Sequence, residues 1–214
     1  MRELTQICKL SAWIFFVPFI SINFCLLISV NPLIFENTIF VVDQIGRSGF
    51  TIPYLDGSLS ISRASRTYPQ YLIFKPSMIA TGCLLIIYWM TTNDIMREFS
   101  LSKKNFYFKN FGILSAVFLM IHSIFLGLNF DNDFLKLAKR IFLVGFILFE
   151  LFAQSLLIYN FYKYKQKIKF FINSFVLKLK FILVGLLVLV AIIVSPILSS
   201  NDYTHLKHAL EWNY

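Results

Sequence analysis

Five long blocks of apolar residues constrain this chain more than any other feature of its sequence. They run through residues 11–30, 72–92, 110–128, 141–159 and 181–199. A helix of about 20 apolar residues, rising about 1.5 Å per residue, crosses a hydrocarbon core about 30 Å thick. We therefore predict an all-α, polytopic bundle of five membrane-spanning helices that forms a single transmembrane domain over residues 1–214.

Composition excludes the main alternatives to this bundle. The chain is 57% hydrophobic and 14% charged, whereas soluble domains are about 45–50% apolar and about 25% charged. A transmembrane barrel would need strands of about ten residues with alternating polarity, and the sequence lacks that pattern. Only helices and closed barrels pair every backbone group in lipid, so the apolar blocks are predicted to be helical.

The distribution of basic residues predicts the orientation. If the amino end is cytoplasmic, twelve of the 20 lysines and arginines fall in cytoplasmic segments and eight on the outer side. Lysine and arginine in short loops are retained on the cytoplasmic side, so we expect a cytoplasmic amino end. The net charge of +9 follows largely from these inner residues and requires no nucleic-acid partner.

Three short segments carry a resemblance to a known family. Residues 52–64 read IPYLDGSLSISRA, residues 68–75 read YPQYLIFK, and a Glu-Trp-Asn run occupies 211–213. The Pro-Tyr and serine-rich segment before the second span, the Pro-Gln pair at its mouth and the Glu-Trp-Asn run resemble the DRAM/Sfk/CWH family of six-span membrane proteins. That family includes autophagy modulators, plasma-membrane phosphoinositide regulators and proteins that remodel the lipid of GPI anchors.

The resemblance implies a topology but no catalytic motif. In the family the Glu-Trp-Asn run opens a sixth helix, so the resemblance implies that this chain lacks the sixth span. The apolar and aromatic residues at 206–214 also predict a helix near the membrane. Lys139-Arg140 followed by Phe149, Ala153 and Gln154 is similar to bacterial members.

The outer loop, predicted over residues 31–71, leads into the second span and contains candidates for binding a lipid headgroup. Guanidinium forks and hydroxyls can donate several hydrogen bonds to one phosphate. The candidates are Asp56, Ser58, Ser60, Ser62, Arg63, Arg66 and Lys75. The alternative is an outer cap whose acids neutralise its own arginines, with Lys75 extending to the membrane interface.

Polar residues inside the third and fourth spans form a second group of candidates, namely His122, Glu150 and Gln154. A lone carboxylate in a bilayer is costly, so Glu150 is expected to face protein. Gln154 lies one turn further on the same helix face. Depth along the helices places His122 near Glu150 and Ser115 near Gln154. A site that responds to protons or binds a headgroup is one interpretation, and a structural interhelical hydrogen bond is the favoured one.

Enzyme and metal signatures are absent from the sequence: there is no G-x-S-x-G, GxxxxGK[ST] or H-E-x-x-H. We expect no metal, no cofactor and no catalytic residue. The leading hypothesis is a non-enzymatic protein of the DRAM/Sfk type that binds membrane lipids or a membrane protein partner. The alternatives are a lipid-remodelling enzyme with His122 or Glu150 as its base, and a channel or carrier lined by Glu150. A lipid-transfer site requires these residues and the outer arginines to converge on one cavity.

Overall fold

The computed structural model describes residues 2–31, 51–100, 106–128, 133–168, 173–199 and 204–213, and within these ranges it contains nine helices and no strand. The long helices are α1 (Arg2–Val30), α4 (Tyr71–Ser100), α5 (Tyr107–Phe125), α6 (Asp133–Lys163) and α8 (Ser174–Ser199). Each contains a stretch long and apolar enough to cross a membrane. The protein is therefore an all-α, multi-pass membrane protein, and the prediction of a five-span bundle is confirmed.

The helix boundaries differ from the predicted spans, mostly by extension. At the end predicted to be cytoplasmic, α4 continues to Ser100 and α8 begins at Ser174. An apolar block marks only the hydrocarbon crossing, and a helix can continue into the interface without losing backbone hydrogen bonds. The third span has the predicted length but lies three residues earlier, at Tyr107–Phe125. It ends at Phe125 because Leu126 is extended (ψ 132°) and Gly127 has a φ of +83°.

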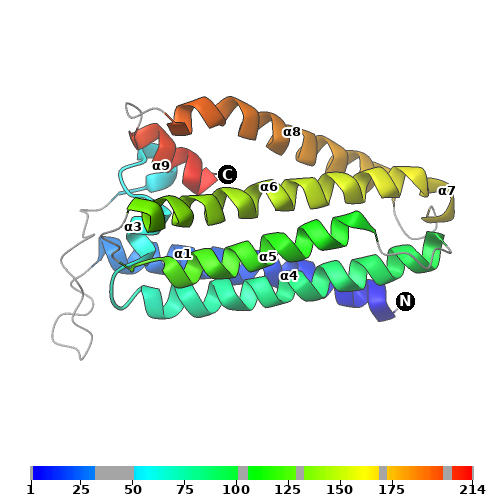
Figure 1. Ribbon diagram of the computed structural model, residues 1–214, viewed down its shortest axis with the longest axis horizontal. Helices are drawn as coiled ribbons and strands as arrows, with labels where there is room; N and C mark the ends of the chain where they lie inside the picture. Colours follow the sequence, from blue (N-terminus) through cyan, green and yellow to red (C-terminus); the bar gives the residue numbers. More distant parts are fainter. Residues whose placement is uncertain are drawn as a thin grey trace.

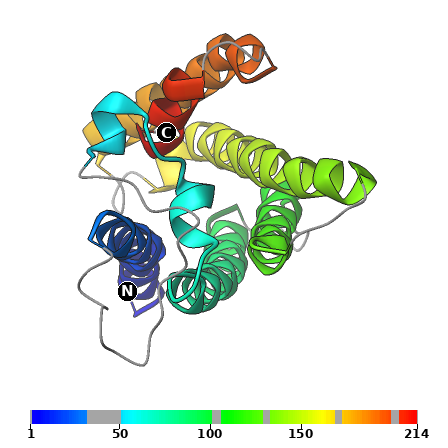
Figure 2. The same ribbon diagram turned by 90° about the vertical axis from the view of Figure 1, so that its left-hand side faces the viewer.

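The long helices run side by side, and the connections gather at two opposite ends (Figure 1). The amino terminus and α7 (Lys165–Ile168) lie at one end, and α2 (Pro53–Asp56), α3 (Ile61–Ser65) and α9 (Thr204–Asn213) lie at the other. Viewed from the α9 end, α1, α4, α5 and α6 follow one another around an arc, and α8 lies beyond α6 (Figure 2). The arc leaves space between its two arms, α1 and α6.

The core of the arc is built on aromatic residues and small residues. Trp89 and Phe108 have no exposed surface, and their ring centroids are 6.0 Å apart. Gly112 of α5 receives the Trp89 ring, because a Cβ at this position would lie 2.3 Å from the ring atoms. Small residues at helix contacts allow such close approach in membrane proteins.

At the α9 end, α2, α3 and α9 form a cap over the bundle. Trp212 donates its Nε1–H to the Leu59 carbonyl at 2.6 Å, and its ring centroid lies 5.0 Å from that of Tyr54. Asn213 Nδ2 donates to the Tyr54 carbonyl at 2.7 Å. The predicted helix at 206–214 is thus confirmed up to Asn213, whereas the predicted loop contains two short helices. Residues 32–50 of that loop and Tyr214 lie outside the described residues.

Gly57 is required where the cap closes. Its φ of +59° is a left-handed conformation, which residues with a Cβ adopt only at a cost. A Cβ here would also lie 1.7 Å from the His205 carbonyl oxygen of α9. Two of the three segments that carry the family resemblance, residues 52–64 and 211–213, contact each other in the fold through Tyr54, Trp212 and Asn213.

Candidate functional site

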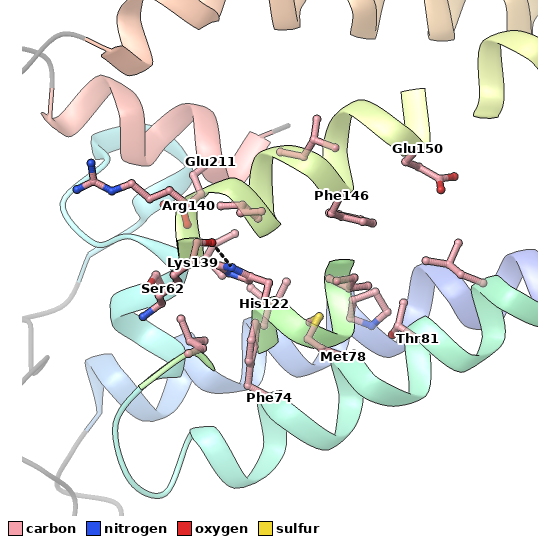
Figure 3. A pocket seen from close by; sticks show the side chains of 18 of the residues that line it. Ser62, Phe74, Met78, Thr81, His122, Lys139, Arg140, Phe146, Glu150 and Glu211 are labelled. Atoms are coloured by element: carbon pink, nitrogen blue, oxygen red, sulfur yellow. Dashed lines mark hydrogen bonds between the residues drawn. The ribbon is translucent and has the colours of Figure 1, made fainter. Parts of the chain in front are cut away.

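A cavity of about 900 Å³ occupies the space inside the arc. It is lined by α1, α4, α5 and α6, with residues of α3, α8 and α9 also contributing (Figure 3). Most of its lining is apolar, including Ile22, Met78, Leu119 and Phe146. Ligand pockets commonly have volumes of about 300–1,000 Å³ and combine apolar walls with a few polar groups. The cavity is therefore the main candidate site in the described structure.

Most of the polar lining residues gather at the α9 end of the cavity, whereas Thr81 and Glu150 lie toward its other end. Figure 3 shows Ser62, Lys139, Arg140 and Glu211 at this end, and Arg66 lies near Lys139. We call these five lining residues the basic mouth. The three cations come from the end of α3 and the first turns of α6, and Arg66 is close enough to Lys139 for their charges to repel. Among the described residues, none of the three cations forms an ion pair. Among the described residues that line the basic mouth, Glu211 is the one acid beside these three cations.

Glu211 is already engaged by the cap. Burial raises the pKa of its carboxyl above the usual value, and hydrogen bonds from the backbone N–H groups of Ser62 and Ile61 partly offset that rise. These amides belong to the first turn of α3, where N–H groups lack partners within the helix. Ser60 satisfies the next amide by accepting from Arg63 N at 3.1 Å. Glu211 thus links α9 to the start of α3.

Only two of the seven predicted headgroup residues, Ser62 and Arg66, line the cavity. Asp56 stabilises the turn after α2, where it accepts hydrogen bonds from Ser58 N at 2.9 Å and Thr51 Oγ1 at 2.7 Å. The hydrogen bond from Ser58 N, followed by that from Thr51, lowers the pKa of Asp56 to about 2. The Ser58 hydroxyl itself lies against that of Thr51.

The remaining headgroup candidates also have local roles. Ser60 caps α3, and Arg63 is exposed and lies outside the cavity lining. Lys75 donates to the Ile124 carbonyl at 3.3 Å and lies over the Tyr71 ring. Most of the predicted loop site therefore makes local contacts, but among the described residues no acid of the loop forms an ion pair with its arginines, as the alternative of a self-neutralised outer cap would require.

Glu150 lies against protein, as predicted, and lines the cavity away from the basic mouth. Its Oε2 accepts from Ser115 Oγ at 2.7 Å and from Trp89 Nε1 at 3.3 Å. Its Oε1 accepts from Gln154 Nε2 at 2.9 Å. Donors from α4, α5 and α6 therefore satisfy this carboxylate, which would have no hydrogen-bond partner if it faced lipid.

The expected pairing of His122 with Glu150 is not found. His122 Nδ1 lies 3.1 Å from the Lys139 carbonyl oxygen, near the basic mouth. A carbonyl only accepts hydrogen bonds, so Nδ1 carries the proton. Ser115, predicted to lie level with Gln154, instead bonds directly to Glu150. Depth estimates from helix rise failed here because they ignore the rotation of α5 and α6 about their axes.

Lys139, Arg140 and Glu211 were not among the predicted ligand-binding residues. The signal was an adjacent pair of cations immediately before the predicted fourth span. It was counted only toward orientation and family resemblance. Trp89 was also missed, because a tryptophan in an apolar block gives no sign that its N–H is directed at a carboxylate.

The described residues contain no group of three or more His, Cys, Asp or Glu side chains suited to holding a metal ion. His208 uses its Nδ1 in a 3.0 Å contact with the Gly57 carbonyl. Comparison of the chain with known protein families, with curated proteins and with solved structures finds no match. The function must therefore be argued from the cavity itself.

Proposed function

We propose that this protein binds a membrane lipid in the cavity and acts by binding rather than by catalysis. The single observation that carries the proposal is a cavity of about 900 Å³ that is apolar along its length and basic at one end. An amphiphile has the same division between an apolar body and a polar head. The cavity lies among helices that themselves cross the membrane, so lipid is the most abundant molecule of that kind nearby.

The contacts of His122 and Glu150 support binding over catalysis. Each side chain is tied into hydrogen bonds that join α5 or α4 to α6. Within the described residues, no hydroxyl or thiol is hydrogen-bonded to His122, although nucleophilic catalysis relies on such a pair. Lipid remodelling is retained as the second candidate because His122, Glu150 and Arg66 line one cavity. A channel is disfavoured because the lining is mainly apolar.

The experiment compares two leucine substitutions on α6. Leu143 lines the cavity, whereas Leu148 is 46% exposed on the same helix and does not. Leu143→Trp is expected to fill the cavity and reduce the lipid that copurifies in mild detergent, measured by native mass spectrometry. Leu148→Trp should retain wild-type lipid. Equal lipid content in both variants would refute the proposal, and release of lysolipid or free fatty acid by the wild type would favour remodelling.

Orientation and family membership belong to the same proposal. We place the amino end in the cytoplasm because the lysine-rich segments share that end. Cysteines substituted for Lys104 and Lys167 should then be labelled from one side, and a cysteine substituted for Asp131 from the other. Membership in the DRAM/Sfk/CWH family is supported by the contact between Tyr54 and Trp212, which lie in two of the segments that resemble the family.

A further inference from the structure

We propose that the basic mouth recognises the phosphate of an anionic lipid headgroup through Arg66, Lys139 and Arg140. This inference rests on the proposed function and adds the chemical class and the orientation of the ligand. The headgroup lies at the α9 end, between α3 and α6, and the acyl chains extend along the cavity toward Glu150.

The first support is unbalanced charge. Arg66, Lys139 and Arg140 line one end of a mainly apolar cavity, and no described carboxylate forms an ion pair with them. Lys139 is partly buried. Arg66 and Arg140 are exposed, so the cost of a desolvated cation without a counter-ion falls on the Lys139 ammonium group, and a phosphate bound beside it offsets that cost. Glu211 opposes only part of this charge: it is one acid against three cations, it forms no ion pair with them, and its carboxyl accepts hydrogen bonds from the α3 amides.

The second support is the set of donors that the basic mouth offers. Two guanidinium groups, an ammonium group and the Ser62 hydroxyl line the same region. Arginine binds phosphate oxygens in a bidentate manner, and lysine adds a point charge. His122 lies nearby, but its proton is used by the Lys139 carbonyl. All of these donors suit an anion, and none of them favours a quaternary ammonium group.

The third support is the length of the apolar region. Arg140 and Glu150 lie on the same helix, ten residues apart, which corresponds to about 15 Å along α6. That distance is about half the thickness of a hydrocarbon core, so the cavity has the depth of one leaflet. A free phosphate ion would use the cations but leave the apolar walls uncovered. A phospholipid uses both.

The test measures headgroup preference with purified protein in non-ionic detergent. Phosphatidylglycerol, phosphatidylcholine and diacylglycerol compete for the protein, and native mass spectrometry counts each bound lipid. Each cation near an anionic lipid contributes enough to expect a preference of about tenfold or more for phosphatidylglycerol over diacylglycerol. Arg66→Gln and Lys139→Gln together should abolish most of this preference.

Arg63→Gln is the matched control, because Arg63 lies on α3, is exposed and does not line the cavity. This variant should retain the wild-type lipid preference. Every variant should also give the size-exclusion profile of the folded wild type. Arg66→Gln alone, at an exposed position, keeps the test valid if Lys139→Gln fails to fold.

Three outcomes would overturn the inference. If wild type retains lipid without any preference, the headgroup inference is wrong while the proposed function stands. If millimolar inorganic phosphate displaces phosphatidylglycerol as effectively as excess lipid does, the basic mouth is a site for a soluble phosphate. If no lipid binds and Leu143→Trp changes nothing, the proposed function itself has failed. A preference lost in Arg66→Gln and kept in Arg63→Gln would support the inference.

Discussion

Helices α4 and α8 differ sharply in packing. In the most apolar stretch of α4, 39% of residues are buried within the fold, against 6% in α8. α4 and α5 meet through Gly112 and Trp89, and α5 and α6 meet through Gly145, where a Cβ would lie 2.4 Å from the Phe118 ring. α8 lacks such contacts at Gly185, which has nothing within 4 Å of its Cβ position.

This difference shows how a membrane protein can keep a cavity. Lipid chains are as apolar as leucine, so apolar side chains alone do not drive helices together. Close approach needs small residues, shape matching or polar pairs, and these are concentrated on α4, α5 and α6. Where they are missing, α8 remains beside the bundle and the interior between the arms stays open. The cavity therefore remains because such close contacts between helices are missing on this side of the bundle.

The largest expected effect tests this contrast with two glycines. Gly112→Ala places a Cβ against the Trp89 ring, whereas Gly185→Ala meets nothing within 4 Å. Overpacking a well-packed core costs about 1–3 kcal/mol, so Gly112→Ala should lower the thermal unfolding temperature clearly. Gly185→Ala should leave it unchanged or raise it slightly, because alanine favours helix over glycine. Equal effects in a thermal-shift measurement would show that α5 and α8 do not differ in how closely they are packed at these glycines.

A smaller effect is expected at Glu150, whose hydrogen bonds join α6 to α4 and α5. Glu150→Gln should lower stability by about 0.6 kcal/mol and by no more than about 1.7 kcal/mol, the range of interhelical hydrogen bonds in membranes. A double-mutant cycle with Ser115→Ala should show coupling, because the two side chains are hydrogen-bonded. The cycle with His122→Ala should be additive, since His122 bonds to Lys139 instead.

The measurements for this cycle are folded yield in detergent and lipid retention. A purely structural role predicts that both fall in step. Loss of lipid retention at normal yield in Glu150→Gln would instead place Glu150 in contact with the ligand.

Sequence patterns predicted the spans because hydrocarbon thickness sets the length of apolar blocks. The same reasoning predicted that Glu150 faces protein and that residues near 206–213 are helical. It placed Gln154 on the same helix face as Glu150, but it did not find the partners Ser115 and Trp89 on other helices, since helix rise gives depth but not rotation. The basic mouth was not predicted because Arg66 and Lys139 are 73 positions apart in the sequence, and only the fold brings Arg66 close to Lys139.

A third prediction concerns the cap formed by α2, α3 and α9. Gly57→Ala should displace α9, because its Cβ would meet the His205 carbonyl and its φ is +59°. Hydrogen exchange should then accelerate at residues 204–213 and remain unchanged in α4 and α5. Leu55→Ala, at a side chain that is 81% exposed on α2, should leave exchange unchanged. Unaltered protection of α9 in Gly57→Ala would mean that the cap does not depend on this contact.

The smallest expected effect is a pH dependence of the same cap. Burial raises the pKa of Glu211 above its usual value of 4.5, so the folded cap binds a proton more tightly than the unfolded segment does. This contribution to docking is complete below about pH 4.5 and is lost as the pH rises through the raised pKa. Docking of α9 should therefore be tighter at about pH 4 than at about pH 8.

Acrylamide quenching of Trp212 can measure this change in a Trp13→Phe background, because the other tryptophan, Trp89, is fully buried. Quenching should increase with pH, and Glu211→Gln should flatten the increase. The sign of the slope separates two roles for Glu211. If its carboxylate were the counter-ion of Arg140, ionisation would strengthen the cap and quenching would fall as the pH rises. That result would mean that Glu211 already neutralises charge in the basic mouth, which would weaken the case for an anionic ligand in the cavity.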